Sequence, residues 1–143
     1  GEQPGGVWRV GGGFEDDDIA DLLSSLEANP TAWSEAMAPA IMGVPERPEL
    51  GQELTESFCR LNPKIAVDFA RATFMSDNRD DLPMIGARTL VLQCQQDIIA
   101  SKKVGMFVRD KIPGATLTML EATGHCPNLS APDEVIASMR AFL

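Results

Sequence analysis

The sequence has 143 residues, and 12 Lys and Arg against 21 Asp and Glu give it a formal net charge of −9. This length is typical of one domain, and the 44% of hydrophobic residues can form a core, which excludes a wholly disordered chain. The pI of about 4.5 argues against nucleic-acid phosphate or an anionic membrane surface as a partner. No apolar run approaches the roughly 18 residues of a membrane span.

The cysteine pattern indicates a reducing compartment, so we expect a cytoplasmic protein. Cys59, Cys94 and Cys126 are odd in number and widely spaced, and no CxxC pair occurs. This pattern disfavours a disulfide framework or a zinc site, and it favours small buried thiols. The single histidine excludes a histidine-rich metal centre. We expect no metal and no organic cofactor.

Residues 1–14 are rich in glycine and are expected to form a loop or hinge. Their Gly-Gly-Gly-Phe segment lacks the lysine of a phosphate-binding loop and follows no convincing strand. The chain does not begin with Met, and its opening is typical of the interior of a longer protein.

Residues 15–76 are predicted to form four amphipathic helices with short connections. Proline or asparagine separates them, and Pro39 inside the second helix should kink that helix or end it early. The predicted helices are 16–28, 31–42, 48–61 and one that begins at Pro63.

The apolar stripes of these helices carry large side chains that permit two interpretations. They could pack as an ordinary helix–helix core, or they could form a lid whose inner face lines an apolar substrate cavity. The residues concerned are Trp33, Met37, Leu54, Phe58, Phe69 and Phe74.

After a polar connector, residues 77–143 follow a strand–helix–strand–helix order that predicts a βαβ unit of a parallel sheet with a covering helix. The nearly continuous apolar run at 88–94 is typical of a strand buried on both faces. The second strand is predicted at 115–120, and the last helix should pack an apolar face from Val135 to Leu143.

Asp97 and His125 follow the two predicted strands. Neighbouring parallel strands lie about 5 Å apart, so side chains at their carboxyl ends can reach hydrogen-bond distance. An aspartate that accepts the imidazole Nδ1–H leaves the other ring nitrogen free to take a proton from a serine hydroxyl. A loop or capping aspartate and a structural histidine remain the alternative.

These residues resemble the α/β-hydrolase fold. Within it, they resemble the RsbQ-type bacterial stress-signalling hydrolases, which are relatives of the plant karrikin and strigolactone receptors. The resemblance spans nearly the whole chain from about residue 11 and includes the Gly-Gly-Phe-Glu string at 12–15. Its most specific parts are Asp-Ile-Ile-Ala at 97–100 and Gly-His-Cys-Pro at 124–127.

The resemblance implies the C-terminal half of such a hydrolase, with residues 15–76 as a four-helix lid and residues 77–143 as part of the core. It implies that Asp97 is the acid and His125 the base of a catalytic triad, and that Trp33 and Phe74 face the pocket. The G-x-S-x-G frame of the nucleophile is absent from the sequence. The resemblance therefore places the serine upstream of this chain.

Three functions remain open from the sequence. The first is the C-terminal part of a serine hydrolase acting on a small apolar ester or lactone. The second is a ligand sensor whose lid recruits a regulatory phosphatase or another signalling protein, with slow or secondary hydrolysis. The third is a helical interaction protein in which Asp97 and His125 are incidental, and the buried-type strand at 88–94 argues against it.

Overall fold

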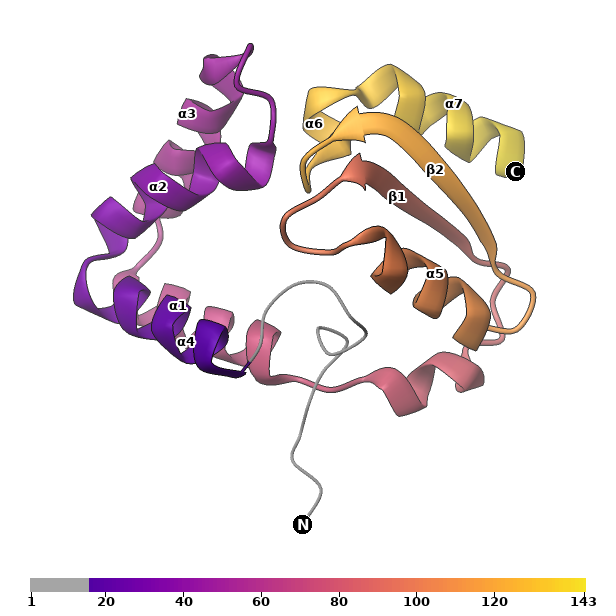
Figure 1. Ribbon diagram of the computed structural model, residues 1–143, viewed down its shortest axis with the longest axis horizontal. Helices are drawn as coiled ribbons and strands as arrows, with labels where there is room; N and C mark the ends of the chain where they lie inside the picture. Colours follow the sequence, from indigo (N-terminus) through magenta and orange to yellow (C-terminus); the bar gives the residue numbers. More distant parts are fainter. Residues whose placement is uncertain (1–15) are drawn as a thin grey trace.

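The computed structural model describes residues 16–143, so the loop predicted at residues 1–14 lies outside the described part. Figure 1 shows a helical half and an α/β half, joined by a segment that contains the 3₁₀ helix η2 (Arg79–Met84). The strand–helix–strand–helix order predicted for the second half is confirmed.

Four helices form the first half and lie in two pairs, α1 with α4 and α2 with α3 (Figure 1). The Asn29 side chain caps α2 by accepting the backbone N–H of Ala32 at 3.0 Å, and Asn62 caps α4 in the same way. Each of these two helices begins with a proline, which fits the first turn because no N–H donor is needed there. Their bounds are α1 Asp16–Ala28, α2 Pro30–Met42, α3 Pro48–Cys59 and α4 Pro63–Met75.

Helix α2 ends at Met42, as predicted, so of the two effects expected of Pro39, a kink or an early end, the early end does not occur. Tertiary contacts hold this last turn in place. Met42 is 2% exposed, and Gly51 of α3 packs closely on the Pro39 ring. Gly43 then ends the helix in the left-handed conformation, with its N–H bonded to the Pro39 carbonyl.

The second half contains a two-stranded parallel sheet in which β1 (Leu90–Gln96) pairs with β2 (Thr116–Thr123). Leu90 lies opposite Thr116, and the register shifts between Cys94 and Gln96. Both strands begin and end later than predicted. A short helix that the sequence did not predict precedes the last one. The remaining elements are η2 Arg79–Met84, α5 Lys102–Lys111, α6 Pro127–Ser130 and α7 Pro132–Phe142.

Buried apolar residues form a core in each half of the structure. Two predictions of burial are wrong, since Ile136, Met139 and Leu143 on the expected apolar face of α7 are 45%, 50% and 90% exposed, and Leu90, Val91 and Leu92 of β1 are only half-buried. Phe69 of α4, for which the sequence left core packing or cavity lining open, is 72% exposed. The physical reason is that, within residues 16–143, no further strand or helical layer covers these faces. The buried apolar residues are Leu22, Leu23, Leu26, Ala38, Met42, Cys94, Ile99, Val104, Ile112 and Leu120.

Among the described residues, no helix is long and apolar enough to cross a membrane. The same part of the chain contains no group of three or more His, Cys, Asp or Glu side chains arranged to hold a metal ion.

Candidate active site

The structure brings Asp97 and His125 together at the carboxyl ends of the two parallel strands. Asp97 follows β1 directly, and His125 lies two residues beyond the end of β2. The His125 Nδ1 atom lies 2.8 Å from Asp97 Oδ2, which is hydrogen-bond distance. The parallel pairing predicted from the sequence is what makes this contact between residues 28 positions apart possible.

The loop after β1 holds the Asp97 carboxylate firmly. Its Oδ1 atom accepts the backbone N–H groups of Ile99 at 2.8 Å and Ala100 at 3.0 Å, while Oδ2 faces His125. The Asp97 side chain is only 6% exposed. Burial by itself raises the pKa of Asp97, but the hydrogen bonds from His125, Ala100 and Ile99 outweigh it and lower that pKa below its ordinary 3.8. Asp97 is therefore a carboxylate at neutral pH.

The His125 ring is oriented at one nitrogen and accessible at the other. An ionised Asp97 can only accept a hydrogen bond, so Nδ1 carries a proton, and in the neutral form of the ring Nε2 is the nitrogen with the lone pair. The His125 side chain is 42% exposed, and Nε2 has no hydrogen-bond partner within residues 16–143. The ring is thus suited to take a proton from an incoming donor.

Gln93, a buried glutamine in β1, supports the Asp97 loop and is not among the site residues predicted from the sequence. Gln93 is 5% exposed, and its side-chain Nε2 donates to the Ala100 carbonyl at 2.9 Å. Gly105 of α5 packs against it so closely that a Cβ there would lie 2.5 Å from Gln93 Oε1. The sequence signal for Gln93 was its position within an apolar strand, because a buried amide needs hydrogen-bond partners.

The two cysteines near the pair are poorly suited to act as its nucleophile. Burial, followed by the charge of Asp97, raises the pKa of the Cys94 thiol to about 11. The same two causes raise the pKa of the Cys126 thiol. Because the thiolate is the reactive form, both groups are poor nucleophiles at neutral pH.

The helical half contains an apolar cavity of about 230 Å³ between its two helix pairs. Trp33, Phe58 and Phe74, three of the predicted substrate-binding residues, line it, and the Trp33 and Phe58 ring centroids lie 5.9 Å apart. Ile41 of α2 and Phe69 of α4 line it as well. Trp33 and Phe74 therefore line one cavity.

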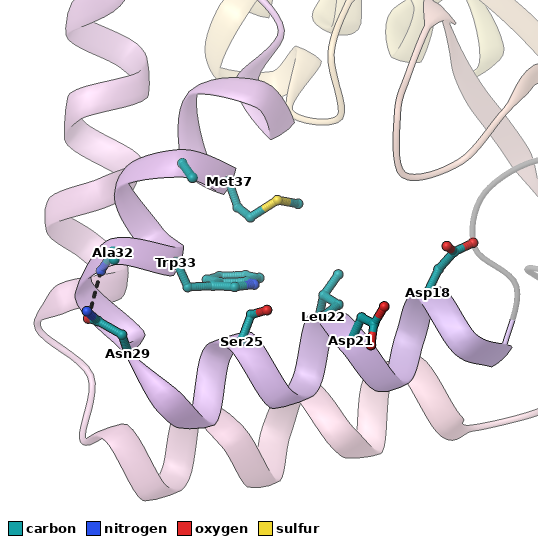
Figure 2. A pocket seen from close by; sticks show the side chains of 9 residues that line it. Asp18, Asp21, Leu22, Ser25, Asn29, Ala32, Trp33 and Met37 are labelled. Atoms are coloured by element: carbon teal, nitrogen blue, oxygen red, sulfur yellow. Dashed lines mark hydrogen bonds between the residues drawn. The ribbon is translucent and has the colours of Figure 1, made fainter.

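A wider groove of about 790 Å³ runs between α1 and α2 (Figure 2). Trp33 and Met37 project into it from α2, with Leu22 on α1 facing them. Asp18 and Asp21 line its other end (Figure 2). The groove thus combines an aromatic and thioether surface with the Asp21 carboxylate, which favours ligands without negative charge.

Two expectations about the binding residues differ from the structure. Leu54 is half-buried in α3 and lines neither cavity. Asp97 and His125 do not line these cavities either, although we expected the pair to open toward the same space. Asp97 instead borders a separate hollow of about 490 Å³ with Lys102 and Lys103 of α5.

Comparisons with known proteins show which fold this arrangement belongs to. The chain is 32% identical over 133 residues to Strigolactone esterase D14 of Arabidopsis thaliana, and the match covers 92% of the chain and 49% of the esterase. It is 29% identical to Karrikin insensitive 2 receptor CA of Petunia hybrida, covering 87% of the chain and 47% of the receptor. No family model matches the chain.

A solved structure of a hydrolase from Oleispira antarctica superposes with a TM-score of 0.87 at 36% identity, covering 92% of the chain and 48% of the hydrolase. The chain has part of an α/β-hydrolase fold. It is related to the strigolactone esterases and karrikin receptors, and it spans about half the length of these relatives. An esterase from Exiguobacterium antarcticum shares the fold at 19% identity, with a TM-score of 0.81 and coverage of 94% of the chain and 53% of the esterase.

Proposed function

We propose that this chain supplies the acid, the base and the lid of a serine α/β-hydrolase that acts on a small apolar ester or lactone. The observation that carries the proposal is the 2.8 Å contact between His125 Nδ1 and Asp97 Oδ2, together with the exposure of the His125 side chain, which leaves the second ring nitrogen free to act. The helical region expected at residues 15–76 acts as the lid, and residues 77–143 act as part of the core. The nucleophilic serine lies outside this sequence, which contains no G-x-S-x-G frame.

The geometry supports a two-step acyl transfer. His125 Nε2 takes the serine proton as the serine oxygen attacks the substrate carbonyl, and the charge of Asp97 stabilises the imidazolium that forms. His125 then gives this proton to the leaving oxygen, which departs as an alcohol. In the second step His125 takes a proton from water, and the resulting hydroxide attacks the acyl carbonyl. The bond between that carbonyl and the serine oxygen then breaks, the acid product leaves, and His125 returns its proton to the serine oxygen.

The lining of the lid supports an uncharged, largely apolar substrate. Trp33, Phe58 and Phe74 offer aromatic surface, and the Asp21 carboxylate in the wider groove repels an anion. Two relatives are named strigolactone esterases, which favours a lactone among small esters.

A chimera tests the proposal. The first half of the Oleispira antarctica hydrolase is joined ahead of this chain, and hydrolysis of nitrophenyl acetate is measured. We expect turnover by the chimera, loss of turnover in His125→Ala, and about a 10⁴-fold lower kcat in Asp97→Asn, as for a wrong tautomer in the serine-protease precedent. Turnover that survives His125→Ala would reject the assignment.

The chain alone provides the second arm of this test. Because it lacks the serine frame, we expect neither ester turnover nor labelling by a fluorophosphonate probe. Stoichiometric labelling of one of its own serines would show that the nucleophile lies within these 143 residues.

A ligand sensor is the second candidate function, and the relatives named karrikin receptors favour it. In this case the lid recruits a regulatory phosphatase or another signalling protein, and hydrolysis is slow or secondary. If the protein is a sensor, a lactone should promote capture of a partner by the chimera even when His125→Ala has removed turnover. If it is only a hydrolase, no such capture is expected.

A further inference from the structure

The C-terminal end of α2 meets the loop that carries His125. The His125 backbone N–H donates to the Ile41 carbonyl at 2.8 Å, and the Thr123 hydroxyl donates to the Gly43 carbonyl at 2.8 Å. Between them, the Gly124 N–H donates to the Gln96 carbonyl of β1 at 2.7 Å. Three consecutive residues, from the last residue of β2 to His125, are thereby fixed by hydrogen bonds to the end of a lid helix and to the neighbouring strand.

Two glycines allow this close approach. Gly43 and Gly124 have φ values of +67° and +82°, in the left-handed region that favours glycine. A Cβ added at Gly43 would lie 2.5 Å from the Gly124 Cα, and one added at Gly124 would collide with the Met42 carbonyl oxygen. The backbones of helix and loop are therefore in direct contact, and a side chain at either position would separate them.

The same helix lines both cavities of the lid. Trp33 borders both, Met37 borders the wide groove, and Ile41, whose carbonyl holds His125, borders the smaller cavity. Less than one turn separates Ile41 from Gly43. Helix α2 therefore both lines the two cavities and anchors the His125 backbone.

We infer that the junction of Gly43, Thr123 and Gly124 positions the His125 ring against Asp97, so that these three are positioning residues for the reaction proposed above. The inference rests on that proposed function for its catalytic meaning. Its physical content is that helix α2 fixes the His125 backbone, and through it the Nδ1 contact with Asp97.

His125 is the only histidine in the chain, so its imidazole can be observed directly. The experiment is a long-range ¹H–¹⁵N correlation spectrum of the labelled chain at mildly alkaline pH, where one set of ring signals reports which nitrogen carries the proton. We expect the native chain to show the Nδ1-protonated ring. We expect Thr123→Val to lose this single form and to show a mixture of both tautomers.

Matched controls separate positioning from general destabilisation. Thr118→Val makes the same substitution in β2, at a threonine whose hydroxyl has no hydrogen bond in the described part of the chain, and it should leave the ring signals unchanged.

A pair of glycine variants provides a second control. Gly43→Ala should alter the ring signals, whereas Gly114→Ala should not. Gly114 has a similar φ of +70° but open space around its Cβ position. Both alanine variants carry the same backbone strain, so only the contact distinguishes them.

Native ring signals in folded Thr123→Val would overturn the inference, as would equal changes in Thr123→Val and Thr118→Val. If Gly43→Ala does not fold, the threonine pair still decides, because it leaves the glycine contact in place. The spectrum is recorded without turnover. An inactive chimera therefore rejects the proposed function alone, and unchanged ring signals reject the junction alone.

Discussion

Asp97 and Asp77 are two aspartates whose pKa values both lie below the ordinary 3.8, for different reasons. The side chain of Asp97 is almost enclosed, and hydrogen bonds from His125, Ala100 and Ile99 stabilise its charge against the cost of burial. Asp77 is lowered chiefly by its hydrogen bond with Arg79 on the surface. Salt screens an exposed pair far more than an enclosed one, so the two shifts should respond differently to ionic strength.

The first prediction concerns acid stability. A folded-state pKa below the unfolded value means that ionised Asp97 stabilises the fold fully above pH 3.8, and this contribution is lost as the pH falls through the folded pKa. The difference in free energy of unfolding between the native chain and Asp97→Asn should therefore shrink below pH 3.8. Urea titrations across this pH range measure it.

The control is Asp77→Asn, whose smaller effect should disappear in about 0.5 M salt, while the Asp97→Asn effect persists. If the difference in free energy of unfolding between the native chain and Asp97→Asn stays constant down to the lowest pH at which the chain folds, the lowered pKa of Asp97 is contradicted.

The second prediction concerns the thiols. With a pKa of about 11, Cys94 is almost entirely protonated at pH 8, and the raised pKa of Cys126 acts in the same direction. Cys59 is exposed. We expect a disulfide reagent such as Ellman's reagent to modify one thiol rapidly in the native chain and all three only after unfolding. A Cys59→Ser variant should remove the rapid phase, and a rapid phase that survives it would be the contrary result.

At the scale of elements, the helices were predictable because local signals define them. Asn29, Asn62 and the prolines after them fix the starts of α2 and α4, and the 3.6-residue period identifies the buried face of α1. In α2 the predicted stripe of Trp33 and Met37 is only half-buried, and the buried face is the neighbouring one of Ser34, Ala38 and Met42. The short helix α6 was missed because four residues carry no periodic pattern. The strand ends were displaced because a strand continues as far as its partner does, and the partner is distant in sequence.

The candidate site was predictable only in part. Asp97 and His125 follow directly from strand order, because parallel strands end at one edge. The anchors of their loops do not follow, since Thr123 and Gly43 are 80 residues apart and no periodicity connects them. Gln93 was concealed in the same way, because its partner at Ala100 belongs to a loop whose course the sequence does not define.

A similar long-range anchor, Glu134 in the first turn of α7, provides the third prediction. Its carboxylate accepts the backbone N–H groups of Glu121 at 2.6 Å and Ala122 at 3.1 Å, at the end of β2. Hydrogen bonds to a charged group stabilise a fold by about 1.5–3 kcal/mol when buried, and less near the surface. We therefore expect Glu134→Ala to lower the free energy of unfolding by about 1–2 kcal/mol.

The matched control is Asp133→Ala, which removes the same charge from the same helix turn, where a carboxylate favours the helix dipole. Both variants lose the dipole contribution, so the difference between them measures the two hydrogen bonds. Equal losses in chemical denaturation would show that the bonds to β2 add nothing.

At the scale of the whole molecule, the structure exposes apolar surface that a folded domain normally covers. Ile65, Phe69 and Met75 of α4 are 63%, 72% and 59% exposed. Within residues 16–143 the sheet has two strands, so each keeps one unpaired edge. Unpaired strand edges and large apolar patches both promote association between chains.

The last prediction is that the chain associates at micromolar concentration despite its net charge of −9, and that α4 contributes to the contact. Burying a phenylalanine is worth about 1.5–3 kcal/mol, so Phe69→Glu should weaken association by roughly tenfold or more. Ala72→Glu is the control. Ala72 is exposed on the same helix, and its replacement adds the same charge without removing apolar surface. Sedimentation velocity over a concentration series distinguishes the two. If both variants weaken association equally, charge repulsion rather than the apolar face controls it, and a native chain that is monomeric throughout would contradict the prediction altogether.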